Sequence, residues 1–130
     1  MKKQLLMPFL MAFFVFVALP ATASAWEHLG VRSAHSGVDR DELHVGAGEG
    51  EFRKIKLGVT QVAVQFEKVV IHFGDGSEQT VALRDRIRAG GESRAIDLEG
   101  GKRTIEKVVF WYHTSRARKR DGEVHLYGEH

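Results

Sequence analysis

The sequence predicts an all-β protein: an antiparallel β-sandwich, of the jelly-roll or immunoglobulin-like kind, with about eight or nine short strands. Three observations support this fold class. Apolar and polar residues alternate with a period of two in several segments, as they do in strands that place one face on a core. Glycine-rich turns separate these segments at short intervals. One strand-like motif also occurs three times in the chain.

Residues 1–25 have the three parts of a secretory signal peptide. Two lysines form the charged start, residues 5–19 form an apolar stretch that is short for a membrane span, and small residues occupy positions 23–25. We expect cleavage after Ala25, and therefore a periplasmic or secreted protein with no stable membrane anchor. An uncleaved anchor is disfavoured because no basic stop-transfer cluster follows the apolar stretch.

Residues 26–130 are predicted to form a single β-sandwich domain after cleavage. Removal of 25 residues from 130 leaves 105, the size of one domain with a single core. Two lysines leave with the signal peptide, so 17 of the 19 Lys and Arg residues remain against 17 Asp and Glu residues. The mature domain is therefore formally neutral. Because the chain has no cysteine, packing rather than disulfides has to stabilise it.

The repeated motif reads FRKIKL from Phe52, FEKVVI from Phe66 and IEKVVF from Ile105. After each motif lysine, apolar residues fall at every second position, whereas the leading apolar residue is one step out of phase. A β-bulge or a strand bend at the lysine would return the leading residue to the core face, because one extra residue shifts the alternation. The three lysines are either an anion-binding row or outward residues that keep the strands soluble, and we favour the second interpretation.

The predicted strands follow from this alternation and from the turns around it. The clearest strands lie at residues 52–59, 68–73 and 103–114, where the period of two is regular. The other strands are shorter and are bounded by glycine and other turn residues. In chain order, the predicted strands are residues 28–35, 41–45, 52–59, 61–66, 68–73, 78–83, 94–98, 103–114 and 123–128.

Two glycine turns are predicted to form hairpins. The stretch Phe73–Gln79 contains an Asp-Gly pair, which is typical of a type I′ turn with two positive φ angles. The stretch Leu98–Arg103 contains two adjacent glycines and predicts a second hairpin. The stretch Leu83–Gly91 is compatible with a helical turn, a strand or a loop, and the sequence leaves these alternatives open.

Four stretches of the chain together carry a family resemblance. They are WEHLG at Trp26, FRKIKL at Phe52, GESRAIDLEGGKRTIEKVVFWY from Gly91, and a last strand that ends in VHLYG. On these stretches, which cover most of residues 26–130, the chain resembles a family of small exported bacterial proteins catalogued as a domain of unknown function. The resemblance implies a periplasmic or secreted all-β fold. It implies no activity, cofactor or catalytic residue.

The histidines are candidate metal ligands, because imidazoles on adjacent strands bind zinc or copper in proteins. The chain has seven: His28, His35, His44, His72, His113, His125 and His130. We single out His72, His113 and His125 for such a site. No HExxH or His-x-His spacing is present, so scattered surface histidines are the simpler interpretation. A histidine-based metal-binding protein or metal-dependent enzyme is the alternative function, and neither a cofactor nor a catalytic residue is predicted.

The strand at residues 103–114 carries a candidate binding face. Trp111 and His113 fall on the face opposite to the core positions, and Val109 on the same face makes the strand apolar on both sides. Either neighbouring strands and loops cover Trp111, or the indole forms an exposed patch for a ligand or partner.

The segment that follows this strand is strongly basic, although the mature domain is neutral. Its cations are Arg116, Arg118, Lys119 and Arg120. Such a cluster makes a local positive field, and the alternative is a hairpin tip that simply carries soluble residues. We therefore predict an exported, non-catalytic module that binds an anionic component of the cell envelope or a protein partner. Nucleic acid is not expected as a partner of an exported protein.

Overall fold

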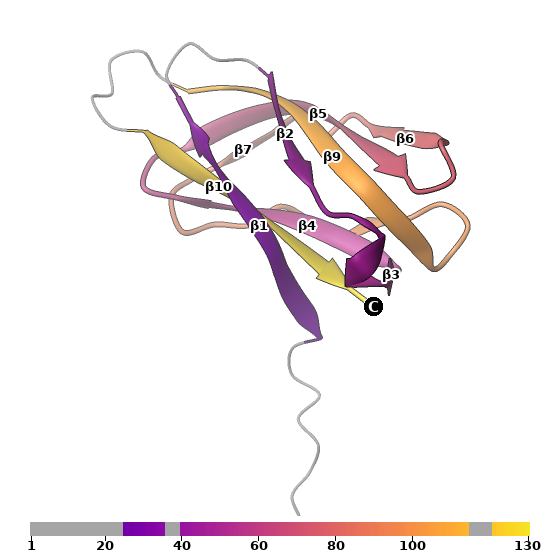
Figure 1. Cartoon of the computed structure of the whole chain (residues 1–130). Coiled ribbons are helices and arrows are strands. Elements are labelled where there is room, and N and C mark those ends of the chain that lie inside the picture. Colours follow the sequence, from indigo (N-terminus) through magenta and orange to yellow (C-terminus); the bar gives the residue numbers. More distant parts are fainter. Residues whose placement is uncertain (1–24, 36–39, 115–120) are drawn as a thin grey trace, which may run out of the picture.

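The computed structural model describes residues 25–35, 40–114 and 121–130, which form two antiparallel β-sheets (Figure 1). The first sheet has four strands. Their order across the sheet is β1 (Trp26–Ala34), β10 (Gly122–Glu129), β4 (Lys54–Thr60) and β8 (Ile96–Asp97). The first and last strands of the described chain are therefore hydrogen-bonded neighbours, and β10 lies between β1 and β4.

The second sheet has six strands. Its main path is β2 (Arg40–His44), β9 (Arg103–His113), β5 (Val64–Phe73) and β6 (Glu78–Val81), with β3 (Glu51–Phe52) beside β9 and β7 (Asp85–Ile87) beside β5. A short 3-10 helix, η1 (Ala47–Glu49), links β2 to β3. The two sheets confirm the predicted all-β sandwich, with ten strands in the described ranges. No helix there is long and apolar enough to cross a membrane.

The hydrophobic core lies between the two sheets and contains the alternate residues of their central strands. Phe66, Phe110 and Tyr112 form an aromatic cluster on the inner face of the six-stranded sheet, with ring centroids 6.1, 6.5 and 5.6 Å apart. The inner face of the four-stranded sheet contributes buried residues such as Leu57 and Leu126. Burial of one such side chain stabilises the fold by about 1.5–3 kcal/mol. The period of two seen in the sequence therefore identifies the core correctly.

The repeated motif is a device that keeps its leading apolar residue in the core. In β5, Glu67 is an extra residue between two positions that pair with β9, and in β9 Glu106 is an extra residue opposite β5. In the copy that begins at Phe52 the chain changes sheets at Arg53, because Phe52 pairs with β9 whereas Lys54 pairs with β10. All three leading residues are fully buried. The predicted bulge or bend is confirmed, although it lies at the polar residue before the lysine.

These irregularities explain where the strand boundaries differ from the prediction. Residues 61–66 and 68–73 were expected to be two strands, but β5 is continuous through the bulge. The expected strand at residues 52–59 is divided between two sheets. The ambiguous stretch Leu83–Gly91 contains the strand β7, and the strand expected at residues 94–98 shortens to β8.

The stretch Phe73–Gln79 forms the predicted hairpin, between β5 and β6, but with a different turn type, whereas the stretch Leu98–Arg103 does not form a hairpin. The turn after Phe73 has Gly76 at φ 92°, but Asp75 is not at positive φ, so it is not a type I′ turn. The Phe73 N–H donates to the Ser77 carbonyl at 2.9 Å, which closes a three-residue loop. Gly100 and Gly101 are both at positive φ, yet their turn joins β8 to β9, which belong to different sheets.

Candidate functional site

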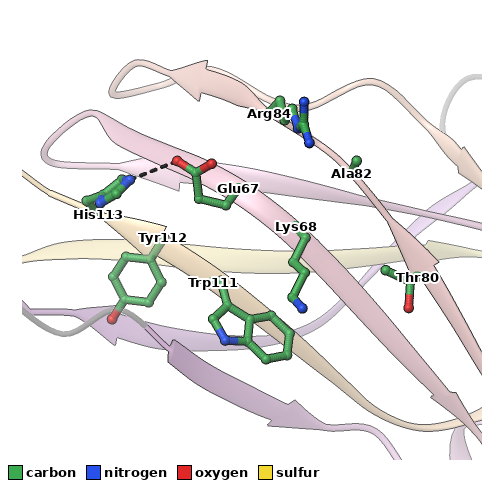
Figure 2. A pocket seen from close by; sticks show the side chains of 8 residues that line it. All are labelled: Glu67, Lys68, Thr80, Ala82, Arg84, Trp111, Tyr112 and His113. Carbon is green, nitrogen blue, oxygen red and sulfur yellow. Dashed lines mark hydrogen bonds and ion pairs between the residues drawn. The ribbon is translucent and has the colours of Figure 1, made fainter.

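A groove of about 440 Å³ lies on the outer face of the six-stranded sheet (Figure 2). Strand β5 contributes its bulge, β9 contributes its last residues, and β6 with the segment after it forms the far wall. The lining residues are Glu67, Lys68, Thr80, Ala82, Arg84, Trp111, Tyr112 and His113. The groove therefore contains both residues of the predicted binding face, Trp111 and His113.

Trp111 lies half-buried between two cations. The bulge brings Lys68 into register with Trp111, and the Lys68 ammonium nitrogen lies 4.4 Å from the centroid of the indole. On the other side Arg40 of β2 pairs with Trp111, and its guanidinium carbon lies 5.5 Å from the ring. Contacts of this kind between a cation and an aromatic face are attractive. The indole is thus neither covered by a loop nor fully open, and cationic side chains flank it.

The charges around the groove are unevenly compensated. The His113 imidazole lies 2.8 Å from a Glu67 carboxylate oxygen, so these two groups pair with each other. Arg40 pairs with Glu42 at 3.2 Å. Lys68 and Arg84 form no ion pair with a carboxylate in the described part of the chain. The groove therefore has two cations whose charge is available to a ligand.

Glu42 neutralises the sheet surface next to the groove. Its carboxylate lies 3.4 Å from the Lys107 ammonium and 3.2 Å from both Arg40 and His44. Desolvation opposes ionisation of this carboxyl, but the charge and hydrogen bond of Lys107, followed by those of Arg40, hold the pKa of Glu42 below its usual value. The cations of β2 and β9 are therefore occupied within the protein, in contrast to Lys68 and Arg84.

The backbone of Arg84 is strained where it borders the groove. Its φ angle of 44° lies in the left-handed region, which residues other than glycine rarely adopt. The Arg84 N–H donates a hydrogen bond of 3.0 Å to the Glu67 carbonyl, so the bulge of β5 holds this conformation. Backbone strain of this kind is concentrated at functional sites. The sequence alone did not single out Arg84, because neither the strain nor the position across the groove from Trp111 is visible in it.

The three histidines chosen as metal ligands are not brought together. His72 lies beside Glu78 on the outer face of the six-stranded sheet, at 3.4 Å, and His113 pairs with Glu67. His125 lies on the other sheet, with its Nδ1 atom 2.9 Å from Nε2 of His28. In residues 25–35, 40–114 and 121–130, no group of three or more His, Cys, Asp or Glu side chains is arranged to hold a metal ion. The proposed metal set therefore does not form one site.

Comparison with known proteins places the chain in a family. Residues 8–128 match the family described as Domain of unknown function (DUF2541). The chain belongs to the DUF2541 family. No curated protein matches it. Among solved structures, the crystal structure of SPBc2 prophage-derived protein YomS is similar, with 16% identity over 88% of this chain and 98% of that chain and a TM-score of 0.42.

The outer face of the other sheet of this DUF2541 chain has a second tryptophan with a lysine above it. The Lys56 ammonium nitrogen lies 4.5 Å from the Trp26 ring centroid and 5.7 Å from that of Tyr127. It also forms an ion pair of 3.0 Å with Glu92. Gly58 leaves room for Tyr127, because a Cβ atom there would approach the tyrosine ring to 3.1 Å. This cluster is filled and neutralised by its own residues.

A polar network joins the two sheets where β1 and β2 lie side by side in this DUF2541 fold. Arg32 donates two hydrogen bonds, of 3.0 and 2.9 Å, to one oxygen of Asp41. The Tyr112 hydroxyl lies 3.5 Å from the other oxygen. Burial, followed by the negative charge of Asp41, raises the pKa of Tyr112 to about 12. We assign this network to the stability of the fold, because its charges are paired within it.

The predicted basic segment lies outside the described residues of this DUF2541 chain. Arg116, Arg118, Lys119 and Arg120 all fall between residues 114 and 121, so no position is given for them. Their role in binding stays a prediction. The motif lysines all lie on outer faces, as favoured, but Lys54 is on the four-stranded sheet whereas Lys68 and Lys107 are on the six-stranded sheet. They do not form one anion-binding row.

Proposed function

We propose that this protein is an exported, non-catalytic binding module and that the Trp111 groove takes an anionic component of the cell envelope. Export is part of the proposal, and the signal-peptide features of residues 1–25 support it. One observation carries the binding role: Lys68 beside the half-buried indole and Arg84 on the far wall of the same groove have no carboxylate partner among the described residues. A concave site with a few convergent polar groups is the usual form of a ligand site.

The charges make an anion the best-matched ligand. The groove has two cations without a carboxylate partner against one carboxylate, that of Glu67, which pairs with His113. The balance is a local positive field, because the other acids lie outside the lining and salt screens them beyond about 8 Å. An arginine fork and a lysine ammonium together bind an acid group through charge-assisted hydrogen bonds. The indole adds contact area beside them. A protein partner with an acidic surface is the competing ligand class, and the experiment below includes it.

The test compares two charge-matched variants. In the first, Lys68 and Arg84 are both changed to Ser, and in the second the exposed Arg88 and Lys102, which do not line the groove, are changed to Ser. Titration of each with inorganic polyphosphate, at low and at moderate salt, measures the anion affinity. We expect the groove variant to lose at least about tenfold in affinity, which corresponds to about one charge-assisted hydrogen bond, and the control to stay near wild type. An equal loss of affinity in both variants would assign binding to net charge and would contradict the proposal.

The basic segment gives a second arm of this test. A variant with Ser at Arg116, Arg118, Lys119 and Arg120 is titrated with anionic vesicles of phosphatidylglycerol and phosphatidylcholine, and with polyphosphate. If the segment takes part, this variant loses affinity in addition to the loss caused by the groove variant. If its affinity equals that of wild type, the segment is a solvated turn and the groove is the sole proposed surface. Polyanion binding that is absent in wild type, with capture of an acidic protein instead, would favour the competing partner class.

A further inference from the structure

The wall of the groove combines a flat aromatic plate with hydroxyl-binding groups. Figure 2 shows Lys68 beside Trp111, the Glu67–His113 pair near one end, and Thr80, Ala82 and Arg84 on the far wall. The face of an indole is electron-rich and attracts the weakly positive hydrogens of a flat apolar surface. A pyranose ring offers such a surface on the side where its C–H bonds point. The aromatic plate therefore suits a sugar ring.

The polar groups of the groove suit the rest of a sugar acid. The Thr80 hydroxyl both donates and accepts hydrogen bonds, and the Glu67 carboxylate accepts them, as sugar hydroxyls require. The planar Arg84 guanidinium matches a carboxylate with two parallel hydrogen bonds, and Lys68 adds a mobile ammonium. A simple anion such as phosphate would use the two cations and leave the indole without a role.

A lipid surface is a poor match for the same groove. Proteins that bind at a membrane surface place large apolar side chains into the headgroup region. In the described ranges the one exposed large hydrophobic residue is Val31, at 43% exposure. Val31 lies in β1 of the four-stranded sheet, whereas the groove belongs to the six-stranded sheet. The groove therefore has an anion site without the apolar rim that membrane insertion needs.

From these observations we infer that the groove binds an acidic saccharide, with a uronic acid ring stacked on Trp111 and its carboxylate held by Lys68 and Arg84. The inference rests on the proposed function and names its ligand class. Lys68 lies 4.4 Å from the indole centroid in the free protein, where it occupies the place of the sugar ring. Binding moves its flexible side chain aside, so that a weak cation–aromatic contact is exchanged for a charge-assisted hydrogen bond with the ligand. The ligand is a free sugar acid or one unit of a polymer.

The chain allows a direct optical test, because Trp26 and Trp111 are its only tryptophans. The variant Trp26→Phe, made in the full chain and purified after expression, leaves Trp111 as the sole indole reporter. Its fluorescence is titrated with glucuronic acid, with a trigalacturonate oligomer and with the neutral maltotriose. We expect a saturable change with the uronates and at least tenfold weaker binding of maltotriose. Oligomer binding that exceeds monomer binding would identify a polymer unit as the ligand, and equal binding would identify the free acid.

Substitutions test which side chains of the groove bind the saccharide. Calorimetric titration of Trp111→Leu and of Lys68→Met with trigalacturonate should each show at least a tenfold loss of affinity, while Lys56→Met, which alters the matching lysine on the other sheet, should not. Circular dichroism establishes that each variant is folded. If Trp111→Leu does not fold, the combination of Lys68→Met with Arg84→Gln tests the same groove.

The possible failures separate the inference from the proposed function. If inorganic phosphate or anionic vesicles bind as well as trigalacturonate, the groove binds anions without recognising a sugar, so the inference is overturned and the proposed function is kept. If maltotriose binds as well as trigalacturonate, the acid group has no role, and the inference of an acidic saccharide is overturned. If uronates and polyphosphate both fail to bind, the inference and the proposed function are both wrong. Binding of trigalacturonate that survives Trp111→Leu and Lys68→Met unchanged would place the sugar elsewhere and overturn the assigned site.

Discussion

The two outer faces of the sandwich repeat one arrangement with different consequences. On each face a lysine ammonium lies over a tryptophan: Lys56 is 4.5 Å from the Trp26 centroid, and Lys68 is 4.4 Å from the Trp111 centroid. Lys56 is also paired with Glu92, and its side chain is only 16% exposed. Lys68 is exposed and has no carboxylate partner in the described part of the chain. The same pair of groups is therefore neutralised on one face and charged on the other.

The difference comes from what lies next to each pair in the sheet. Gly58 of β4 forms an isolated bridge with Glu92, which brings this carboxylate from a distant segment to Lys56. Beside Lys68 the segment that follows β6 contributes Ala82 and Arg84 instead of a carboxylate. A cation over an aromatic ring is thus a purely structural contact where a carboxylate also pairs with the cation. Where no carboxylate does so, the cation and the ring remain available to an anionic ligand.

The largest expected effect concerns the core that both faces share. Phe110→Ala should lower the free energy of unfolding by about 3–5 kcal/mol, because it leaves a cavity beside Phe66 and Tyr112. Lys107→Ala, on the outside of the same strand, should cost about 0.5 kcal/mol or less. Urea unfolding followed by tryptophan fluorescence measures both. Equal losses would show that the assignment of inner and outer faces is wrong, and the comparison of the two faces would lose its basis.

The sequence was sufficient for the sandwich, the strand phase and the bulges, because each is a local pattern. Alternation placed Phe110 in the core and Trp111 outside it, and the phase shift at Phe66 indicated an extra residue nearby. The sequence was insufficient for the turn at Asp75, where the Asp-Gly pair lies in a three-residue loop instead of a type I′ turn. A dipeptide does not determine how many residues the flanking strands leave unpaired.

The site was only half predictable, for a similar reason. Trp111 and His113 were found because they lie on the outer face of an apolar strand. The partners that give the groove its charge are remote in sequence: Arg84 reaches it from the segment before β7, and its strained φ angle depends on the bulge of β5. In the sequence Lys56 and Lys68 both lie within copies of the repeated motif, although only Lys68 is at the position of the motif lysine, and neither copy indicates which of the two has an acid partner. Only the fold shows that Glu92 neutralises Lys56.

Exchange of each lysine for methionine is the sharpest test of the comparison. Lys56→Met leaves Glu92 unpaired and should destabilise the fold by about 0.5–1 kcal/mol without a change in anion affinity. Lys68→Met should change stability by less than about 0.5 kcal/mol, but should lower anion affinity about tenfold. Urea unfolding and calorimetric titration with polyphosphate give the two quantities for each variant. If the two substitutions have the same effects, the faces are equivalent and the groove has no special role.

A smaller effect is expected where the backbone borders the groove. Arg84 has φ 44° and Gln61, in the connection before β5, has φ 79°, so glycine should relieve strain at both. Each change to glycine should range from neutral to a stabilisation of about 1 kcal/mol, because the relief is partly offset by the greater freedom of glycine in the unfolded chain. Only Arg84→Gly should weaken anion binding. Retained affinity in Arg84→Gly would mean that the strained conformation belongs to the turn alone and that Arg84 does not contribute to anion binding.

The smallest effect is a pH dependence at the C-terminus, where His130 joins the ends of the described chain. Its Nε2 atom lies 2.6 Å from a Glu27 oxygen, its Nδ1 atom lies 2.8 Å from the Glu51 carbonyl oxygen, and its ring stacks on Phe52. The hydrogen bond with Glu27, followed by that with the Glu51 carbonyl, raises the pKa of His130 above the usual value for histidine. A raised histidine pKa contributes stability that is fully present below pH 6.5 and is lost as the pH rises through the folded-state pKa.

His130→Gln should therefore lower the free energy of unfolding more at about pH 5.5 than at about pH 8.5, although solvent screening keeps the difference small because the imidazole is exposed. In a Glu27→Gln background the main cause of the raised pKa is gone, so His130→Gln should have nearly the same effect at both pH values. Anion affinity should not respond to either substitution at a fixed pH, because the Glu27–His130 pair does not line the groove. A loss of stability in the single variant that does not change with pH would assign His130 to packing on Phe52 alone.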